Sequence, residues 1–253
     1  MHNGELVVRL DRVGKVYGTG ASAVTALEDV TYGFARGSFT AVMGQSGSGK
    51  TTLLQCAAGL TRPTSGTVRI GGADLGVLKE AELAAMRRER VGFVFQAFNL
   101  LPALTARENI ELPLRLAGRR PDPEWMRELV DRAGIARHVH RRPHELSGGQ
   151  QQRTAICRAL AARPEVVFAD EPTGNLDSRS GQEILAMLRG IADGLGQTVV
   201  MVTHDAAVAA HAHRVLFLAD GRPADVMEAP TAERLAAAIT GQPRRPGVTR
   251  PAS

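Results

Sequence analysis

The 253-residue chain is poor in cysteine and aromatic residues, and it has no long hydrophobic run. Its two cysteines, Cys56 and Cys157, lie among apolar neighbours, which favours buried reduced thiols over a disulfide or a redox centre. No apolar stretch approaches the roughly 20 residues that a membrane-spanning helix needs, so the sequence predicts no such helix. Residues 1–5 also lack the basic-then-apolar pattern of a secretory signal. We therefore expect a soluble, cytoplasmic protein.

Lysine is scarce as well, and arginine carries most of the net charge of +5. Arginine pairs at 87–88, 119–120 and 141–142 are compatible with contacts to nucleic acid or to an anionic membrane surface. Aromatic residues, which form stacking platforms for single strands, do not accompany these pairs. Solvated helix faces are the simpler interpretation, and we expect no nucleic-acid partner.

The length and the 43% hydrophobic content fit one α/β domain. Alternating apolar and polar residues at 6–13 and 30–34 predict antiparallel strands, and residues 68–70 complete this small sheet. In the second half, helical and extended patterns alternate, which predicts right-handed crossovers and a parallel sheet with helices on both faces. The expected helices there are 150–162, 180–195 and 206–212, and the expected strands are 166–169, 198–202 and 215–218.

A helical insertion is predicted between the two halves. A helix at 79–90 and a strand at 91–95 precede it, and helices at 106–116 and 123–133 lie within it, separated by the breaker at 118–121. We expect this helical subdomain to cover about residues 97–147. Residues 242–253, rich in proline, arginine and glycine, predict a disordered tail.

The first chemical signal is a glycine-rich loop directly after the apolar stretch at 39–43. The loop and the threonine after it comprise Gly44, Gln45, Ser46, Gly47, Ser48, Gly49, Lys50, Thr51 and Thr52. In this pattern backbone N–H groups surround the α- and β-phosphates, the lysine reaches the β/γ oxygens, and the threonine hydroxyl ligates Mg²⁺. An incidental turn would not explain Lys50 and Thr51 at the start of a helix, where an anion is already favoured. The loop predicts a nucleoside triphosphate site.

Polar residues that follow three predicted strands supply candidate catalytic groups. Asp170 and Glu171 follow one strand, and Gln96 and His204 follow two others. We expect Asp170 and Gln96 to contact Mg²⁺, and Glu171 to polarise the attacking water. Gln96 can touch the same water, and His204 can donate to the γ-phosphate. The alternatives are that Asp170 and Glu171 merely start a loop, that Gln96 is a solvent-facing amide, and that His204 is a structural histidine. A shared position at strand ends favours the catalytic roles.

Other candidates keep two interpretations. Asp177 can cap the helix that follows it, with or without a functional role. Tyr17 can stack on adenine or pack in the core. His138, His140 and His144 match no common zinc spacing, so a solvated basic loop is favoured over a metal site.

A second glycine-rich segment opens another helix with Ser147, Gly148, Gly149 and Gln150. Its backbone N–H groups and the serine hydroxyl predict a second anion site. One chain thus has two phosphate-binding devices but only one lysine loop and one carboxylate pair. The simplest arrangement is a head-to-tail homodimer in which Ser147 of one copy faces the nucleotide held by Lys50 of the other. Two ATP molecules would then be buried between the copies.

These residues together resemble the ATP-binding cassette (ABC) family, the nucleotide-binding subunits of ABC transporters. The resemblance covers about residues 6–221 and is carried by the phosphate loop at 44–51, the glutamine loop at Gln96, the signature at 146–150, Asp170 and Glu171, the D-loop Asp177 and the switch histidine His204. It implies a P-loop NTPase core with a mixed, mainly parallel sheet, an antiparallel β subdomain and an inserted α-helical subdomain, together making an ABC ATPase domain at 1–241. Residues 95–102 and 171–177 resemble the branch of lipoprotein-release, macrolide-export and cell-division ATPases.

The resemblance implies an ATPase that uses ATP and Mg²⁺ and drives a separate integral-membrane permease docked near the glutamine loop. It places the protein at the inner face of the cell membrane. Apolar Phe98, Leu100 and Leu101 suit such a docking groove, or they pack the subdomain. The alternative is a soluble ABC-type ATPase acting on nucleic acid or ribosomes. Members of those kinds carry long coiled-coil insertions or two cassettes, whereas this sequence has one cassette and no heptad insertion.

Overall fold

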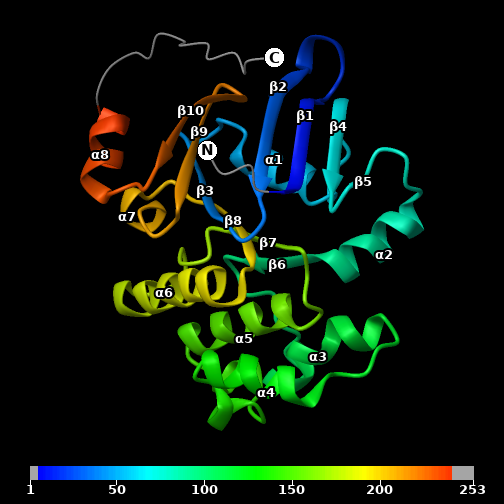
Figure 1. Cartoon of the computed structure of the whole chain (residues 1–253), viewed down its shortest axis with the longest axis vertical. Helices are drawn as coiled ribbons and strands as arrows, with labels where there is room; N and C mark the ends of the chain where they lie inside the picture. The colour runs from blue at the N-terminus through cyan, green and yellow to red at the C-terminus, as the bar shows by residue number, and fades with distance from the viewer. Residues whose placement is uncertain (1–4, 241–253) are drawn as a thin grey trace.

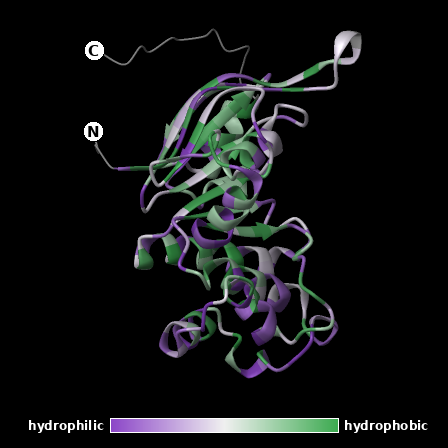
Figure 2. Ribbon diagram, turned by 90° about the vertical axis from the view of Figure 1, so that its right-hand side faces the viewer, coloured by the Kyte–Doolittle hydropathy of each residue, from purple (hydrophilic) through white to green (hydrophobic). Residues whose placement is uncertain are grey.

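The computed structural model describes residues 5–240, so the tail predicted at 242–253 lies outside the described residues. Two sheets form the upper part of the molecule and a group of helices forms the lower part (Figure 1). Hydrophobic colour is concentrated along the strands, and hydrophilic colour is more extensive on the lower helices (Figure 2). Within residues 5–240, no helix combines the length and apolar character needed to cross a bilayer.

The larger sheet has six strands and places the candidate residues. Its order is β10 (Arg222–Glu228), β9 (Arg214–Ala219), β3 (Phe39–Met43), β8 (Thr198–Val202), β7 (Val166–Asp170) and β6 (Val91–Phe95). All neighbours are parallel except β10, which pairs antiparallel with β9. The strands β3 and β8 are buried along their whole length, as expected for continuous apolar runs covered on both faces.

The smaller sheet is antiparallel, with the order β2 (Val24–Ala35), β1 (Leu6–Tyr17), β4 (Ser65–Ile70) and β5 (Ala73–Asp74). Its inward-facing residues, such as Val8 and Leu10, are fully buried. They form a core with one face of the larger sheet and with the helix after the phosphate loop. A second core fills the other face of the larger sheet, against the helical part.

The helices surround these cores on both sides. They are α1 (Lys50–Ala57), α2 (Glu80–Arg90), α3 (Ala106–Leu116), α4 (Pro123–Arg132), α5 (Gly148–Leu160), α6 (Ser178–Leu195), α7 (Ala206–Ala209) and α8 (Ala232–Thr240), with short 3₁₀ turns at Gly20–Ser22, Ala136–His138 and Pro143–Glu145. The mixed, mainly parallel sheet, the antiparallel sheet and the helical insertion confirm the predicted fold class.

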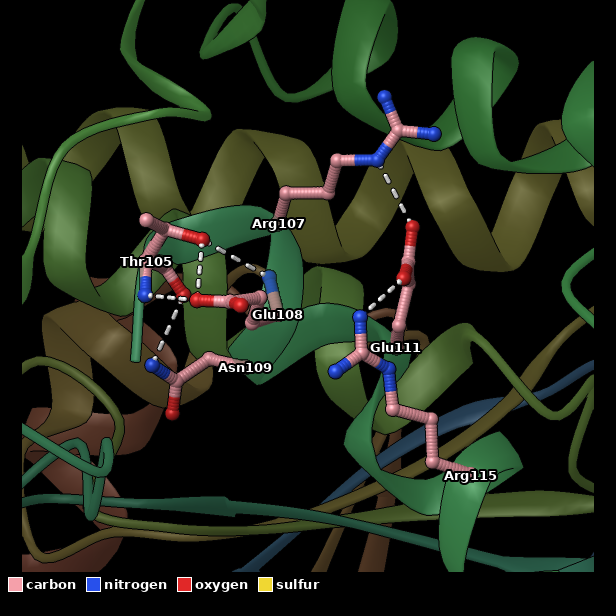
Figure 3. Close-up of polar contacts among 6 residues, drawn as sticks. All are labelled: Thr105, Arg107, Glu108, Asn109, Glu111 and Arg115. Atoms are coloured by element: carbon pink, nitrogen blue, oxygen red, sulfur yellow. Dashed lines mark hydrogen bonds and ion pairs between the residues drawn. The ribbon is translucent and has the colours of Figure 1, made fainter. Parts of the chain in front are cut away.

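The start of α3 shows how the sequence closes this helical insertion (Figure 3). The Thr105 hydroxyl accepts from Glu108 N at 3.3 Å, and Glu108 Oε2 accepts from Thr105 N at 2.8 Å. This reciprocal pair satisfies two N–H groups that a helix start leaves unpaired. The side chain of the buried Asn109 accepts from Leu101 N through Oδ1 at 2.8 Å. Its Nδ2 donates to the carbonyls of Leu101 and Leu104 at 3.1 and 3.2 Å. The loop before α3 is therefore fixed to the helix.

A nearly buried carboxylate stabilises the next turns of α3. The Glu111 side chain is only 9% exposed, and it lies between two arginines one turn away on either side (Figure 3). Arg107 Nε lies 2.8 Å from one oxygen and Arg115 Nη2 lies 3.0 Å from the other. Pairing of both oxygens compensates for the loss of hydration of the carboxylate.

Several elements differ in extent from the sequence prediction. The strands β1 and β2 form a long hairpin of 12 residues each, and α7 ends at Ala209 instead of 212. The strand β10 and the helix α8 had no predicted counterpart. In contrast, the prediction for the cysteines is confirmed: Cys56 and Cys157 are buried free thiols. Burial raises the pKa of Cys56 to about 11 and that of Cys157 to about 12.

Candidate active site

The phosphate loop connects β3 to α1 and leaves the start of α1 open. Gly49 is the N-cap of α1, with φ of +94° and no side chain to bond the first N–H groups. A Cβ at Gly49 would collide with the carbonyl oxygen of Ala26, so only glycine fits this left-handed position. The unpaired N–H groups and the helix dipole at this end favour an anion.

Lys50 is held inside the loop by its own backbone. Its Nζ donates to Gly44 O at 2.9 Å and to Gln45 O at 2.8 Å, which leaves one of its three protons for a ligand. Burial lowers the pKa of Lys50, and the negative charges of Glu171 and Asp170 partly offset this shift.

Asp170 is the last residue of β7, at the edge where three parallel strands end together. In the sheet register it lies beside Phe95 of β6 and Val202 of β8. Burial and the neighbouring charge of Glu171 raise the pKa of Asp170, and Lys50 acts in the opposite direction. The carboxylate thus sits in a partly desolvated position where a cation would favour its ionised form.

Glu171 leaves the sheet in an unusual backbone conformation and contacts His204. Its φ is +44°, a left-handed value that is uncommon for a residue with a side chain, and its N–H donates to Val202 O at 3.0 Å. Glu171 Oε1 accepts from His204 N at 3.2 Å and lies 2.6 Å from His204 Nδ1. A carboxylate only accepts, so Nδ1 carries the proton. Oε1 is therefore occupied, and Oε2 is the oxygen available to a water molecule.

Gln96 directly follows β6 and is fixed by a residue that the sequence did not single out. Gln96 Nε2 donates to Asn175 Oδ1 at 3.1 Å, and Asn175 Nδ2 donates to Gln96 O at 3.1 Å. Because the amide nitrogen of Gln96 is engaged, its amide oxygen is the atom that can ligate a cation or bind water.

The donors near the phosphate loop suit Mg²⁺ better than a transition metal. Thr51, Gln96 and Asp170 offer hydroxyl, amide and carboxylate oxygens, the ligand type that Mg²⁺ prefers. Within residues 5–240, no group of three or more histidine, cysteine or acidic residues is arranged to hold a metal. This donor set fits an ion held by a few protein oxygens together with phosphates.

The second glycine-rich segment opens α5 in the helical part of the molecule, whereas α1 lies in the upper part (Figure 1). Ser147 is the N-cap: its Oγ accepts from Gln150 N at 3.3 Å, and Gln150 Oε1 accepts from Ser147 N at 3.0 Å. The Ser147 hydroxyl proton is not used in this cap and can be donated to an anion. Gly148 and Gly149 form the first turn of α5.

The structure resolves the two interpretations of Asp177 and Tyr17 differently. Asp177 caps α6 by accepting from Ser180 N at 3.0 Å, which confirms the capping prediction. Tyr17 is 41% exposed at the end of β1, so the core-packing alternative is wrong. Lys15 Nζ lies 5.1 Å from the centre of the Tyr17 ring.

Sequence reasoning missed three side chains that hold this site together. Asn175 bonds Gln96, the buried Gln152 donates to two backbone carbonyls beside the site, and Arg158 donates to the carbonyls of Phe98 and Asn99 just after Gln96. Their targets are mostly backbone oxygens far away in sequence, and no local pattern signals such contacts.

Comparisons with known proteins identify relatives of this chain. The profile of the family described as "ABC transporter" matches residues 27–174. The macrolide export ATP-binding/permease protein MacB 1/2 of Paracoccus denitrificans (strain Pd 1222) is 47% identical over 221 residues, covering 87% of this chain and 33% of that protein. MacB of Rhodopseudomonas palustris (strain HaA2) is 46% identical over 240 residues, covering 93% and 36%. The chain spans about a third of the length of these relatives.

Solved structures match over nearly their whole length. The dimeric ATP-binding cassette MJ0796, bound to ADP and Pi, is 40% identical with a TM-score of 0.79, covering 88% of this chain and 99% of that one. The protein cbiO1 from Clostridium perfringens, described as part of the ABC transporter complex cbiONQ, is 25% identical with a TM-score of 0.78, covering 92% and 91%.

Proposed function

This chain belongs to the ABC transporter family, and we propose that two copies of it close head to tail around two ATP molecules to drive a membrane permease. As a cassette of this family it is an ATPase that converts ATP and water to ADP and phosphate. The family resemblance deduced from the sequence is thereby confirmed.

The observation that supports the dimer is that one chain carries two anion-binding helix starts, in different parts of the molecule. The open start of α1 lies with Lys50, Asp170 and Glu171, while the start of α5 with Ser147 lies in the helical part (Figure 1). The chain has one lysine loop and one carboxylate pair for these two helix starts. In a head-to-tail pair about a twofold axis, each Ser147 completes the site of the other copy.

The chemistry follows from the contacts around Glu171. Lys50 binds and neutralises the phosphate oxygens, and backbone N–H groups of the loop add further donors. Glu171 Oε2 takes up a proton from the attacking water, while the imidazole ring and the backbone N–H of His204 hold Glu171 Oε1 in place. Gln96 orients the same water through its amide oxygen. Mg²⁺, when held by Thr51 and Asp170, supplies neutralisation of the charge that develops on the phosphates.

The membrane partner is inferred from the relatives. The MacB relatives are described as ATP-binding/permease proteins, and the cbiO1 relative as part of a transporter complex. We propose that the cassette energises export or mechanical work by a membrane permease, at the inner face of the membrane. Exposed Leu101, after Gln96, is available for this contact.

The replacement Glu171→Gln tests the proposed dimer. It removes the general base while preserving side-chain size, so turnover should fall by two or more powers of ten, within the range for loss of a general base. ATP should still bind, and the variant should accumulate as a dimer in light scattering after size exclusion.

The matched control is the same variant with ADP, which lacks the γ-phosphate and should leave the protein monomeric. Normal hydrolysis by Glu171→Gln would remove Glu171 from its role. A variant that binds ATP and stays monomeric at high concentration would contradict the head-to-tail assembly.

A further inference from the structure

Two side-chain amides tie the end of β6 to the turn that follows β7. The first is Gln152 of α5, and the second is Asn175, two residues before the α6 cap Asp177. Both donate to backbone carbonyls on these segments, which carry Gln96 and Glu171. We call Gln152, Asn175 and the two segments that they join, 95–96 and 172–175, the amide clasp.

Gln152 acts from inside the protein. Its side chain is fully buried, and its Nε2 donates to Pro172 O at 2.6 Å and to Phe95 O at 3.3 Å. One nitrogen thus joins the residue before Gln96 to the residue after Glu171. It comes from the helix that opens with Ser147, so three parts of the candidate site meet at this atom.

Asn175 acts from the outer side. It exchanges two hydrogen bonds with Gln96, one to the side chain and one to the backbone, both at 3.1 Å. Gly174 leaves room for this pair, because a Cβ there would lie 2.7 Å from Gln96 Nε2. The side chain of Gln96 is therefore packed against a turn that admits only a small residue beside it.

The turn that carries Glu171 needs such support. A non-glycine residue in the left-handed region is strained and persists only where its surroundings determine it. Glu171 has φ of +44°, and its carbonyl accepts from Gly174 N at 3.0 Å. The bond from Gln152 to Pro172 O fixes the middle of the same turn.

We propose that Gln152 and Asn175 are positioning residues for ATP hydrolysis, holding Gln96 in register with Glu171 and linking both to the helix that starts at Ser147. The inference rests on the proposed roles of Gln96 and Glu171. Neither clasp residue touches the reacting atoms. Each acts through the position that it gives to a residue that does.

A double-mutant cycle tests the outer half of the clasp. Asn175 is exposed, so Asn175→Ala should fold normally while losing both bonds to Gln96. Turnover at saturating ATP should fall by about tenfold with unchanged ATP affinity, as for the loss of one or two hydrogen bonds. In the Gln96→Ala background, which lacks the side-chain bond but keeps the backbone one, the same change should cause a clearly smaller loss. An equal loss in both backgrounds would overturn the role of Asn175.

Gln197 offers a matched control for the buried half, because its Nε2 also donates to two carbonyls, Pro164 O and Thr198 O, at the opposite end of β8. Gln152→Met and Gln197→Met each remove two hydrogen bonds to carbonyls. Only Gln152→Met should lower turnover, by about tenfold at unchanged ATP affinity. Wild-type turnover in folded Gln152→Met would overturn the role of Gln152.

Failure of the clasp is distinguishable from failure of the proposed function. If Glu171→Gln hydrolysed ATP normally, the general base would be wrong, whereas the cycle between Asn175 and Gln96 would still report their coupling. If Glu171→Gln trapped the dimer but the cycle were additive, the dimer proposal would stand and the clasp would not.

Discussion

The starts of α1 and α5 are both rich in glycine, yet the two helices are capped differently. At α1 the N-cap is Gly49, with no side-chain cap, and Lys50 bonds the loop carbonyls. At α5 Ser147 and Gln150 cap one another. The first start keeps its N–H groups for a ligand, and the second is already stable and offers mainly one hydroxyl proton. We infer that α1 provides most of the nucleotide affinity, and that α5 completes a site formed elsewhere.

Replacement of Lys50 should have the largest effect on this comparison. Lys50→Ala removes the cation from the α1 start, so ATP should no longer protect the protein against thermal unfolding. For the wild type, ATP at about 100 times its Kd should add about 2.7 kcal/mol of stability. The measurement is thermal unfolding with and without ATP. Full protection of Lys50→Ala by ATP would mean that the α1 start is not the main binding device.

The sequence predicted the positions of these residues in the fold because its signals are local. The run from Gly44 to Thr51 fixes a loop and a helix start within eight residues, and Asp170, Glu171 and His204 each follow an apolar strand. Parallel strands end at one edge of the sheet, so periodicity alone brought these side chains together.

Other features had no local signal. The amides of Gln152 and Asn175 act on carbonyls that are 20 to 79 residues away in sequence. The strand β10 pairs antiparallel at the sheet edge and is only partly buried, so its sequence lacks a clear alternating pattern. The positive φ of Glu171 is imposed by tertiary hydrogen bonds rather than by residue type.

Replacement of Ser147 should distinguish the role of the α5 start in turnover from the role of the α1 start in ATP binding. Aspartate caps helices as well as serine does, so Ser147→Asp should preserve α5 while placing a negative charge where the γ-phosphate of the other copy is expected. ATP protection of the protein against unfolding should persist, and turnover should fall by at least about tenfold. Ser147→Asn, a neutral cap, is the control and should lose less. Equal activity of the two variants would argue against a phosphate at this hydroxyl.

The smallest expected effect is a change in melting temperature when the Asp170 carboxylate, beside the start of α1, is replaced. Burial raises the pKa of Asp170, so its ionised form destabilises the fold above that pKa and the cost disappears as the pH falls. Asp170→Asn should therefore melt higher than the wild type near about pH 7 without nucleotide, and the difference should shrink toward about pH 4.

Replacement of Asp177 should change the melting temperature in the opposite direction to replacement of Asp170 over the same pH range. The Ser180 N–H lowers the pKa of Asp177, so Asp177→Asn should melt slightly lower than the wild type near neutral pH, and this loss should fade on acidification. A lower melting temperature of Asp170→Asn at neutral pH would show that attraction by Lys50 outweighs the cost of burial.

Mixing two inactive variants tests most directly whether the two helix starts meet across a dimer. In a pair of Lys50→Ala with Ser147→Asp, one site carries both defects and the other combines an intact Lys50 with an intact Ser147. The mixture should regain ATPase activity, up to about a quarter of the wild-type level when the copies pair at random. Activity no higher than the average of the separate variants would contradict the shared site.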